Sequence, residues 1–161
     1  MSITVSLPEK VLRLLKEKAE AEGRSIEELI LISLLDKYAI NDPETRAELY
    51  LKLSEKYLSE AEKLLRREDY LQASEKAWGA VAEMVKALAA KEGIDLKSHG
   101  ELHRYIAKLV EKTKDIELRR LWSVANELHR NFYEGWLPPE LVKGYIEDVK
   151  ELINKLRKLL T

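Results

Sequence analysis

The chain of 161 residues lacks several residue types that other protein classes need. It has no cysteine, which excludes disulfides and thiolate metal sites, and its only glutamine is Gln72. Few labile amides beside 35% charged residues are typical of heat-adapted proteins, so we expect a thermophilic source. No apolar run approaches the roughly 20 residues that span a bilayer, and no charged leader precedes an apolar stretch. The sequence therefore predicts a cytoplasmic protein with no membrane partner.

The length and composition of the chain are consistent with one domain, or with one domain and a small appendage, around a hydrophobic core. Hydrophobic residues make up 45% of the chain, and the formal net charge is -1. A molecule so close to neutral is no polycation, so any nucleic-acid contact must come from a local patch.

The first 40 residues begin with a pattern of period two, which predicts a strand. Apolar and polar side chains alternate in it, with Ile3, Val5 and Leu7 between Ser2, Thr4 and Ser6. Pro8 ends the pattern. No second strand can be recognised, so the backbone of this strand should pair with the same strand of another copy, which predicts a homodimer or a higher oligomer.

Two helices should follow this strand. The first spans about residues 8–22 and ends at Gly23, and Ser25 with Glu28 forms a capping box that starts a second helix, from Ile26 to about Tyr38. This strand-helix-helix order, with GRS at the turn, resembles ribbon-helix-helix DNA-binding proteins over about 37 residues. We assign residues 1–40 to this segment.

The resemblance leaves two roles open for the segment. Ribbon proteins place polar strand side chains on base edges in the major groove, which would here be Ser2, Thr4 and Ser6. Residues 1–40 carry six basic and seven acidic side chains, a poor balance for a DNA-binding arm. The segment either binds DNA or serves only to dimerise.

The pattern of residues 42–161 predicts an antiparallel up-and-down bundle of helices with short turns. Predicted helices run from Pro43 to about Arg67, from Asp69 to about Gly93, from Ser98 to about Lys112, from Asp115 to about Leu137, and from the Pro138–Pro139 pair to Leu160. The second of these is apolar on nearly every face, with Glu83 and Lys86 its only charges between Ala77 and Ala90. We expect Trp78 to pack at its centre, and Gly79 to lie where a ring such as Trp78 comes close.

Three stretches of the bundle carry a family resemblance: ASEKAWGA, KSHGELH and LHRNFYEGWLPPE. From Asp42 to Leu159 the chain resembles the first branch of the PaREP family of hyperthermophilic archaea, which is counted with the HEPN-like helical bundles. The wider HEPN group includes RNases of toxin and antiphage systems and bundles that pair with nucleotidyltransferases. The resemblance thus implies a toxin-antitoxin-like setting with a toxin or nucleotidyltransferase as partner.

The HEPN nuclease signature is incomplete in this sequence. It needs an arginine followed by four to six residues and a histidine, and Arg130 with Asn131 supplies only its first half. The positions for the histidine hold Gly135, Trp136 and Leu137. The sequence therefore favours a protein without catalytic activity.

The three histidines are the remaining candidates for a binding site. His129 shares a helix face with Tyr133, whereas Asn131 lies roughly 200° away on an ideal helix. His99 and His103 are four residues apart and could bind one metal, but no third ligand is evident. We predict no metal and no cofactor, and keep these five residues as candidate binding residues.

A local excess of three positive charges between Lys97 and Arg130 gives candidate contacts to nucleic acid at Arg119, Arg120 and Arg130. Such a patch can engage only a few phosphates, so binding should be weak. The leading interpretation is a non-catalytic binding or regulatory module, associated with nucleic acid or a nucleotide. The alternative is a divergent, metal-independent RNase centred on His129.

Overall fold

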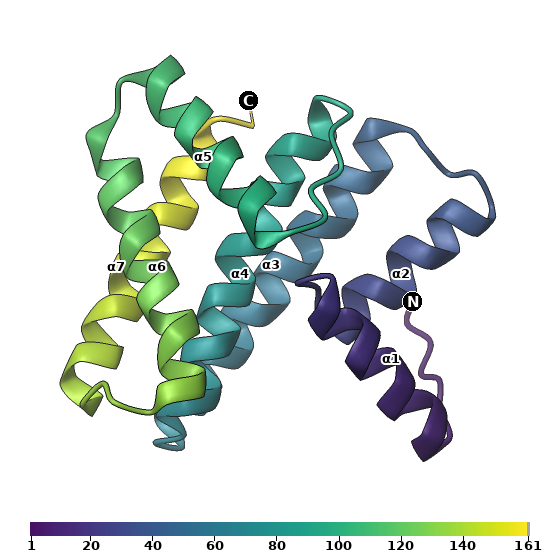
Figure 1. The fold of residues 1–161 in the computed structure, drawn as a ribbon, viewed down its shortest axis with the longest axis horizontal. Helices are drawn as coiled ribbons and strands as arrows, with labels where there is room; N and C mark the ends of the chain where they lie inside the picture. The colour runs from purple at the N-terminus through teal and green to yellow at the C-terminus, as the bar shows by residue number, and fades with distance from the viewer. Residues whose placement is uncertain (161) are drawn as a thin grey trace.

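The computed structural model describes residues 1–160 of the chain and contains seven α-helices in that range (Figure 1). They are α1 (Glu9–Ala21), α2 (Ile26–Lys37), α3 (Pro43–Arg66), α4 (Tyr70–Lys91), α5 (His99–Thr113), α6 (Ile116–Glu134) and α7 (Pro139–Lys158). The mainly helical fold class is confirmed, and α3 to α7 correspond to the five predicted helices of the bundle. None of the helices in residues 1–160 is long and apolar enough to cross a membrane.

The turn between α1 and α2 has the predicted caps. Gly23 adopts φ +64°, and the Arg24 N–H donates to the Ala19 carbonyl at 2.8 Å, which closes α1 with a Schellman-type bond. Ser25 Oγ accepts from the Glu28 N–H at 3.1 Å and caps α2. The capping box is only half formed, because the Glu28 carboxylate binds Arg24 and Lys86 instead of the backbone of Ser25.

The predicted strand from Ile3 to Leu7 is wrong for the single chain, because residues 1–8 have no regular secondary structure. Ile3 and Val5 are 83% and 71% exposed. A strand is held by hydrogen bonds to a neighbouring strand, and residues 1–160 contain none. The alternating pattern is present, but one copy of the chain offers nothing for it to pair with.

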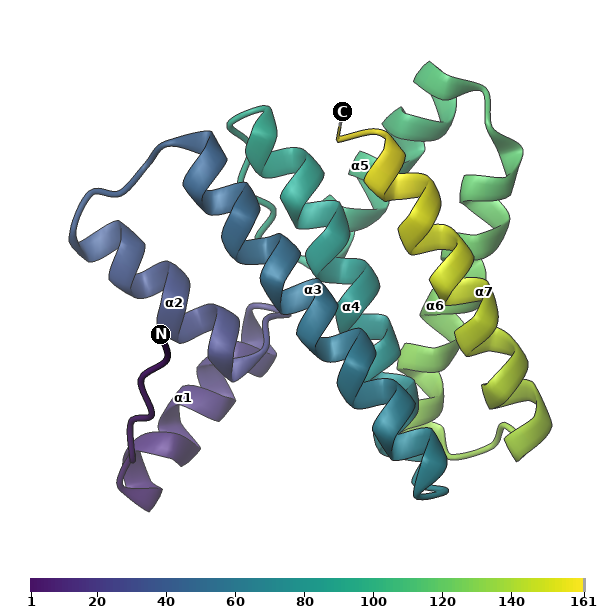
Figure 2. The same ribbon diagram turned by 180° about the vertical axis from the view of Figure 1, so that it is seen from behind.

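Helix α4 is the centre of the bundle. It packs along α3 and also contacts α5, α6 and α7, and fifteen of its 22 residues are buried. Helices α6 and α7 lie on one side of the α3–α4 pair, and α1 and α2 lie on the other side (Figure 2). The N-terminal segment, residues 1–40, is therefore an appendage against one flank of the bundle.

A close approach between α3 and α4 explains the glycine inside α4. A Cβ atom at Gly79 would lie 3.3 Å from Cδ2 of Tyr57 on α3. A ring does come close to the glycine, as expected, and it is the ring of Tyr57 on the neighbouring helix. Trp78 is 4% exposed and belongs to the main core, as predicted.

Exposed apolar side chains are concentrated in the N-terminal part of the described chain. Of the eighteen large apolar residues exposed in residues 1–160, eleven lie within the first 40. The bundle accounts for the other seven, although it is three times longer. Most of the apolar surface of the bundle is buried within the single chain, whereas much of that of the N-terminal segment stays exposed.

Replacing Trp78 by alanine should lower the free energy of unfolding by about 3–5 kcal/mol, because it opens a cavity in the core. Chemical denaturation followed by circular dichroism measures this loss. Trp136→Ala is the matched control, since Trp136 is 53% exposed and should cost far less. Equal effects of the two substitutions would contradict the central position of Trp78.

Candidate functional site at the junction of the N-terminal segment and the bundle

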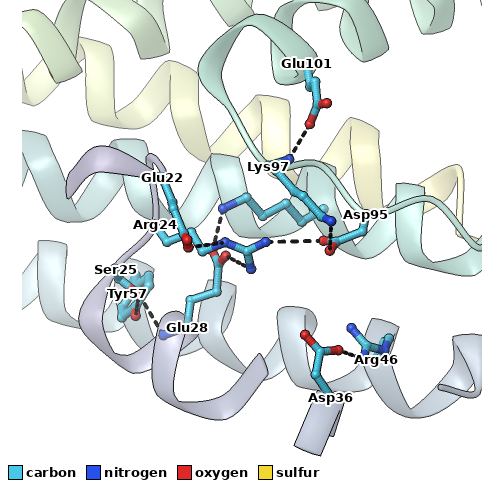
Figure 3. Close-up of polar contacts among 11 residues, drawn as sticks. Glu22, Arg24, Ser25, Glu28, Asp36, Arg46, Tyr57, Asp95, Lys97 and Glu101 are labelled. Carbon is cyan, nitrogen blue, oxygen red and sulfur yellow. Dashed lines mark hydrogen bonds and ion pairs between the residues drawn. The ribbon is translucent and has the colours of Figure 1, made fainter. Parts of the chain in front are cut away.

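Four buried charged side chains join the N-terminal segment to the bundle. Glu28 on α2 is fully buried, and its carboxylate binds the ammonium group of Lys86 on α4, which is 3% exposed. Arg24 and Glu83, both with almost fully buried side chains, complete the group. Figure 3 shows the polar contacts that surround Glu28 and Arg24.

Arg24 connects three acidic side chains around the α1–α2 turn. Its Nη1 donates to Glu28 at 2.9 Å, its Nη2 lies 3.6 Å from Asp95, and its Nε lies 3.5 Å from Glu22 (Figure 3). Asp95 belongs to the loop between α4 and α5, so Arg24 ties the turn to that loop. Next to it, the hydroxyls of Ser25 and Tyr57 are 2.6 Å apart.

Glu83 is the acidic group without a charged partner of its own. Its Oε2 has no hydrogen-bond partner in the described chain. Burial, and then the neighbouring Glu28 carboxylate, raise the pKa of Glu83 well above its usual range. With a neutral Glu83, the cations Arg24 and Lys86 face the carboxylates of Glu28 and Asp95 and the more exposed carboxylate of Glu22.

A buried ion pair of this kind fixes geometry more than it adds stability. Desolvation offsets much of the attraction between Glu28 and Lys86, but loss of either partner leaves an uncompensated buried charge. The pair therefore favours the placement of the N-terminal segment in which both charges are satisfied. Two further ion pairs nearer the surface, Lys56 with Glu27 and Arg46 with Asp36, also join α2 to α3.

A cavity of about 200 Å³ opens beside these charges, between the α1–α2 turn and the bundle. Glu20, Gly23, Arg24 and Ser25 form its N-terminal wall. Tyr57 of α3, His99 of α5 and residues of α4 and α6 form the rest, namely Glu75, Lys76, Trp78, Gly79, Ala82, Glu83, Lys86, His129, Phe132 and Tyr133. The cavity, which we call the junction pocket, is thus shared between the two parts of the chain.

His129 is the best-placed imidazole of the junction pocket. Its Nδ1 lies 2.9 Å from Oε2 of Glu75, and its ring stacks on Trp78 with the centroids 5.0 Å apart. A hydrogen bond to Glu75 requires a proton on Nδ1, so Nε2 of the neutral ring is left as an acceptor. Tyr133 meets the same ring edge-on at 5.4 Å.

His99 stacks on the other side of this group. Its ring centroid is 4.9 Å from that of His129 and 5.8 Å from that of Trp78. Burial, and then the nearby His129 and Lys86, lower the pKa of His99, so this ring is neutral near pH 7. A Cβ atom at Gly23 would come within 3.1 Å of the ring, which places His99 directly against the α1–α2 turn.

His103 and Asn131, the other candidate binding residues, have structural partners. Nδ1 of His103 accepts from the Trp122 indole N–H at 3.0 Å, so it does not share a ligand position with His99. Asn131 is buried, donates to Ser74 Oγ at 3.1 Å and accepts from the Leu137 N–H at 2.8 Å, which closes the α6–α7 turn. Within residues 1–160 no group of three His, Cys, Asp or Glu side chains could hold a metal ion.

The candidate nucleic-acid contacts lie outside the junction pocket. Ser2, Thr4 and Ser6 are exposed on the irregular residues 1–8. On α6, Arg120 pairs with Glu117 at 3.2 Å, and Arg130 pairs with Glu127 at 2.8 Å and lies over the Trp136 ring. Arg119 is exposed. The arginines of α6 therefore face solvent beside acidic neighbours.

A larger and more open groove of about 500 Å³ runs along α5. Arg104, Lys108 and Lys112 line it, but so do Glu92, Asp95 and Glu101, and it holds no histidine. Because the junction pocket combines buried charges with two imidazoles, we place the candidate site there.

Sequence reasoning missed most partners of these side chains. Glu75 lies 54 residues from His129, and Lys86 lies 58 residues from Glu28, so no local pattern connects them. One signal was present: Glu83 and Lys86 are the only charges on an otherwise apolar stretch of α4. Charged residues at such positions must find buried partners.

Comparisons with known proteins matched two parts of the chain. Residues 49–153, about two thirds of the chain, match the model of the archaeal PaREP1/PaREP8 family. Residues 1–39 match the model of ribbon-helix-helix proteins of the copG family. Searches of curated proteins and of solved structures found no match.

Replacing Glu83 by glutamine should flatten the pH dependence of stability. The folded state holds the Glu83 proton more tightly than the unfolded state, so stability is fully present below the unfolded pKa and falls by about 1.4 kcal/mol per pH unit until the folded pKa is passed. The glutamine variant lacks this fall. Melting temperatures between pH 5 and 9 measure it, with Glu55→Gln on the exposed face of α3 as control. If the melting temperature of the wild type changed with pH in the same way as that of Glu83→Gln, a neutral Glu83 would be contradicted.

Proposed function

Because the chain belongs to the archaeal PaREP1/PaREP8 family and opens with a ribbon-helix-helix segment, we propose that it is a homodimeric regulatory protein that contacts duplex DNA. Residues 1–40 supply the dimer and the DNA contact, and residues 42–161 form a binding module without catalytic activity. We also propose that the bundle is HEPN-like and that its partner is a toxin or a nucleotidyltransferase. The support for this part is the family resemblance of its three sequence motifs.

The observation that carries the dimer is the uncovered apolar surface of the N-terminal segment. Helix α2 uses Glu28, Ile32 and Leu35 against the bundle, and leaves Leu31, Leu34 and Tyr38 37–71% exposed on another face. A helix that is apolar around most of its circumference is normally buried on more than one side. A second copy of the segment would cover this face.

The dimer also gives residues 3–7 the partner that one chain lacks. Two copies of this stretch can form an antiparallel ribbon, in which Ile3, Val5 and Leu7 all point to one side. The apolar side would lie on the helices, so Ser2, Thr4 and Ser6 would point away from the protein, toward the bases of a DNA major groove.

The charges of the chain predict modest affinity for DNA. The ribbon offers short hydroxyl donors and no bidentate arginine, asparagine or glutamine, and the whole chain has a net charge of -1. Few phosphates can be neutralised, so binding should be weak and should fall with added salt. A segment that only dimerises is the alternative within this proposal.

The dimer should depend on the exposed face of α2. Leu34 is 51% exposed, so Leu34→Glu should leave the monomer folded. It should raise the dimer dissociation constant by about a hundredfold or more, since two buried carboxylates each cost upwards of about 1.4 kcal/mol. Analytical ultracentrifugation measures this, with the exposed Ser33→Glu as control on the same helix. A wild-type chain that stays monomeric at micromolar concentration would contradict the dimer.

DNA contact should depend on the polar side of the ribbon. Replacing Ser2, Thr4 and Ser6 together by alanine should reduce duplex affinity while the dimer persists. The matched control is Arg119→Ala with Arg120→Ala on α6, which tests whether the bundle carries the binding. Fluorescence anisotropy with labelled duplex at several salt concentrations gives both affinities. Unchanged affinity in the ribbon variant would leave the segment as a dimerisation element only.

A metal-independent RNase is the second candidate function, and one observation favours it. His99 and His129 stack in one pocket, with Glu75 bound to His129 and Tyr133 beside it. Two imidazoles and an orienting carboxylate are groups that general acid–base catalysis can use. The usual spacing of arginine and histidine in the HEPN nucleases is missing, so the RNase remains the second hypothesis.

Under the leading proposal, purified protein should degrade generic single-stranded RNA no faster than His129→Ala does, with or without a chelator. Gel analysis of a labelled oligonucleotide over hours is the measurement, and His103→Ala serves as a second control because His103 lies outside the junction pocket. Robust cleavage that disappears in His129→Ala and persists in His103→Ala would establish the RNase instead.

A further inference from the structure

An apolar groove between α2 and α3 continues the exposed face of the N-terminal segment onto the bundle. The groove has a volume of about 370 Å³, and its apolar lining consists of Leu31 from α2 with Leu49 and Leu53 from α3. Leu31 belongs to both the groove and the exposed face of α2. The two surfaces therefore form one continuous apolar patch that crosses from the N-terminal segment to the bundle.

The edge of this groove carries charges of both signs. Glu48 and Lys52 are 68% and 76% exposed and lie 3.6 Å apart, and Lys56 pairs with Glu27 across the groove. A nucleic acid would require an excess of cations here, which the groove does not have. An apolar floor with mixed charges at the edge is typical of a protein–protein interface.

A second copy of the chain is the occupant that fits best. The proposed ribbon brings a second copy to residues 3–7, and that copy must also cover Leu31, Leu34 and Tyr38. In a twofold dimer the same patch meets itself, so Glu48 of one copy can face a lysine of the other. Because the edge holds both signs, the patch can match its own copy.

We propose that the dimer interface extends from the N-terminal segment onto α3, with the groove between α2 and α3 covered by the second copy. This inference rests on the proposed dimer. It adds that the bundle, and not only the ribbon, forms part of the dimer interface. It places the two α3 helices near the twofold axis and so fixes the two bundles, and their junction pockets, relative to each other.

The absence of cysteine allows a direct test with single spin labels on the full-length chain. Lys52→Cys labels the groove edge, Thr4→Cys labels the polar side of the ribbon, and Glu151→Cys labels the exposed surface of α7, at the opposite side of the molecule from α2 (Figure 1). Pulsed dipolar spectroscopy then gives the distance between the two labels of each dimer. Analytical ultracentrifugation of the labelled proteins confirms that each is still a dimer, as expected for labels on exposed, polar positions.

The expected result is a short distance at Lys52, near the separation of two packed helices, about 10 Å between axes, plus the reach of the two labels. Labels at Glu151 should be much farther apart. Short distances at Thr4 together with Lys52 labels as remote as those at Glu151 would overturn the inference and leave the ribbon dimer standing. Absence of a dipolar signal at all three positions, with monomers in ultracentrifugation, would overturn the proposed dimer itself.

Discussion

The attachment of the N-terminal segment depends on the buried ion pair between Glu28 of α2 and Lys86 of α4. Both side chains are almost completely buried, and the segment also contacts the bundle through Ile32 and Leu35, through Arg24 with Asp95, through Ser25 with Tyr57 and through surface ion pairs. Because each charge would be left uncompensated without the other, the pair favours this placement of α2 over registers that separate the two charges. The junction pocket, the outward face of α2 and the α2–α3 groove all follow from that placement.

The helices could be predicted from sequence because their signals are local. Apolar periodicity and the caps at Gly23, Ser25, Asp69 and Ser98 lie within a few residues of the ends that they define, and the structure has helix ends there. The strand prediction failed for a different reason. The pattern of Ile3, Val5 and Leu7 is suited to a strand, but a strand also needs a partner, and a single chain supplies none.

The candidate site could be predicted only in part, because its contacts join distant positions. Helical spacing was enough to group His129 with Tyr133, but the carboxylate of Glu75 and the ring of His99 reach His129 only through the packing of α4, α5 and α6. Glu28 shows how a correct local rule can mislead. Its position three residues after Ser25 suits a capping box, yet the side chain binds Lys86, since a buried ammonium group needs a counter-charge more than a helix end needs a second cap.

The junction pocket also links the two parts of the chain physically. One wall consists of residues that flank the α1–α2 turn, and the His99 ring lies against Gly23 of that turn. A molecule that bound in the pocket would therefore contact both parts of the chain, and its affinity would depend on where the segment lies. Such coupling is reciprocal, because the free energy that a ligand gains from one position is the free energy by which it stabilises that position. The bundle needs no second conformation for such coupling, because the α1–α2 turn is already part of the pocket.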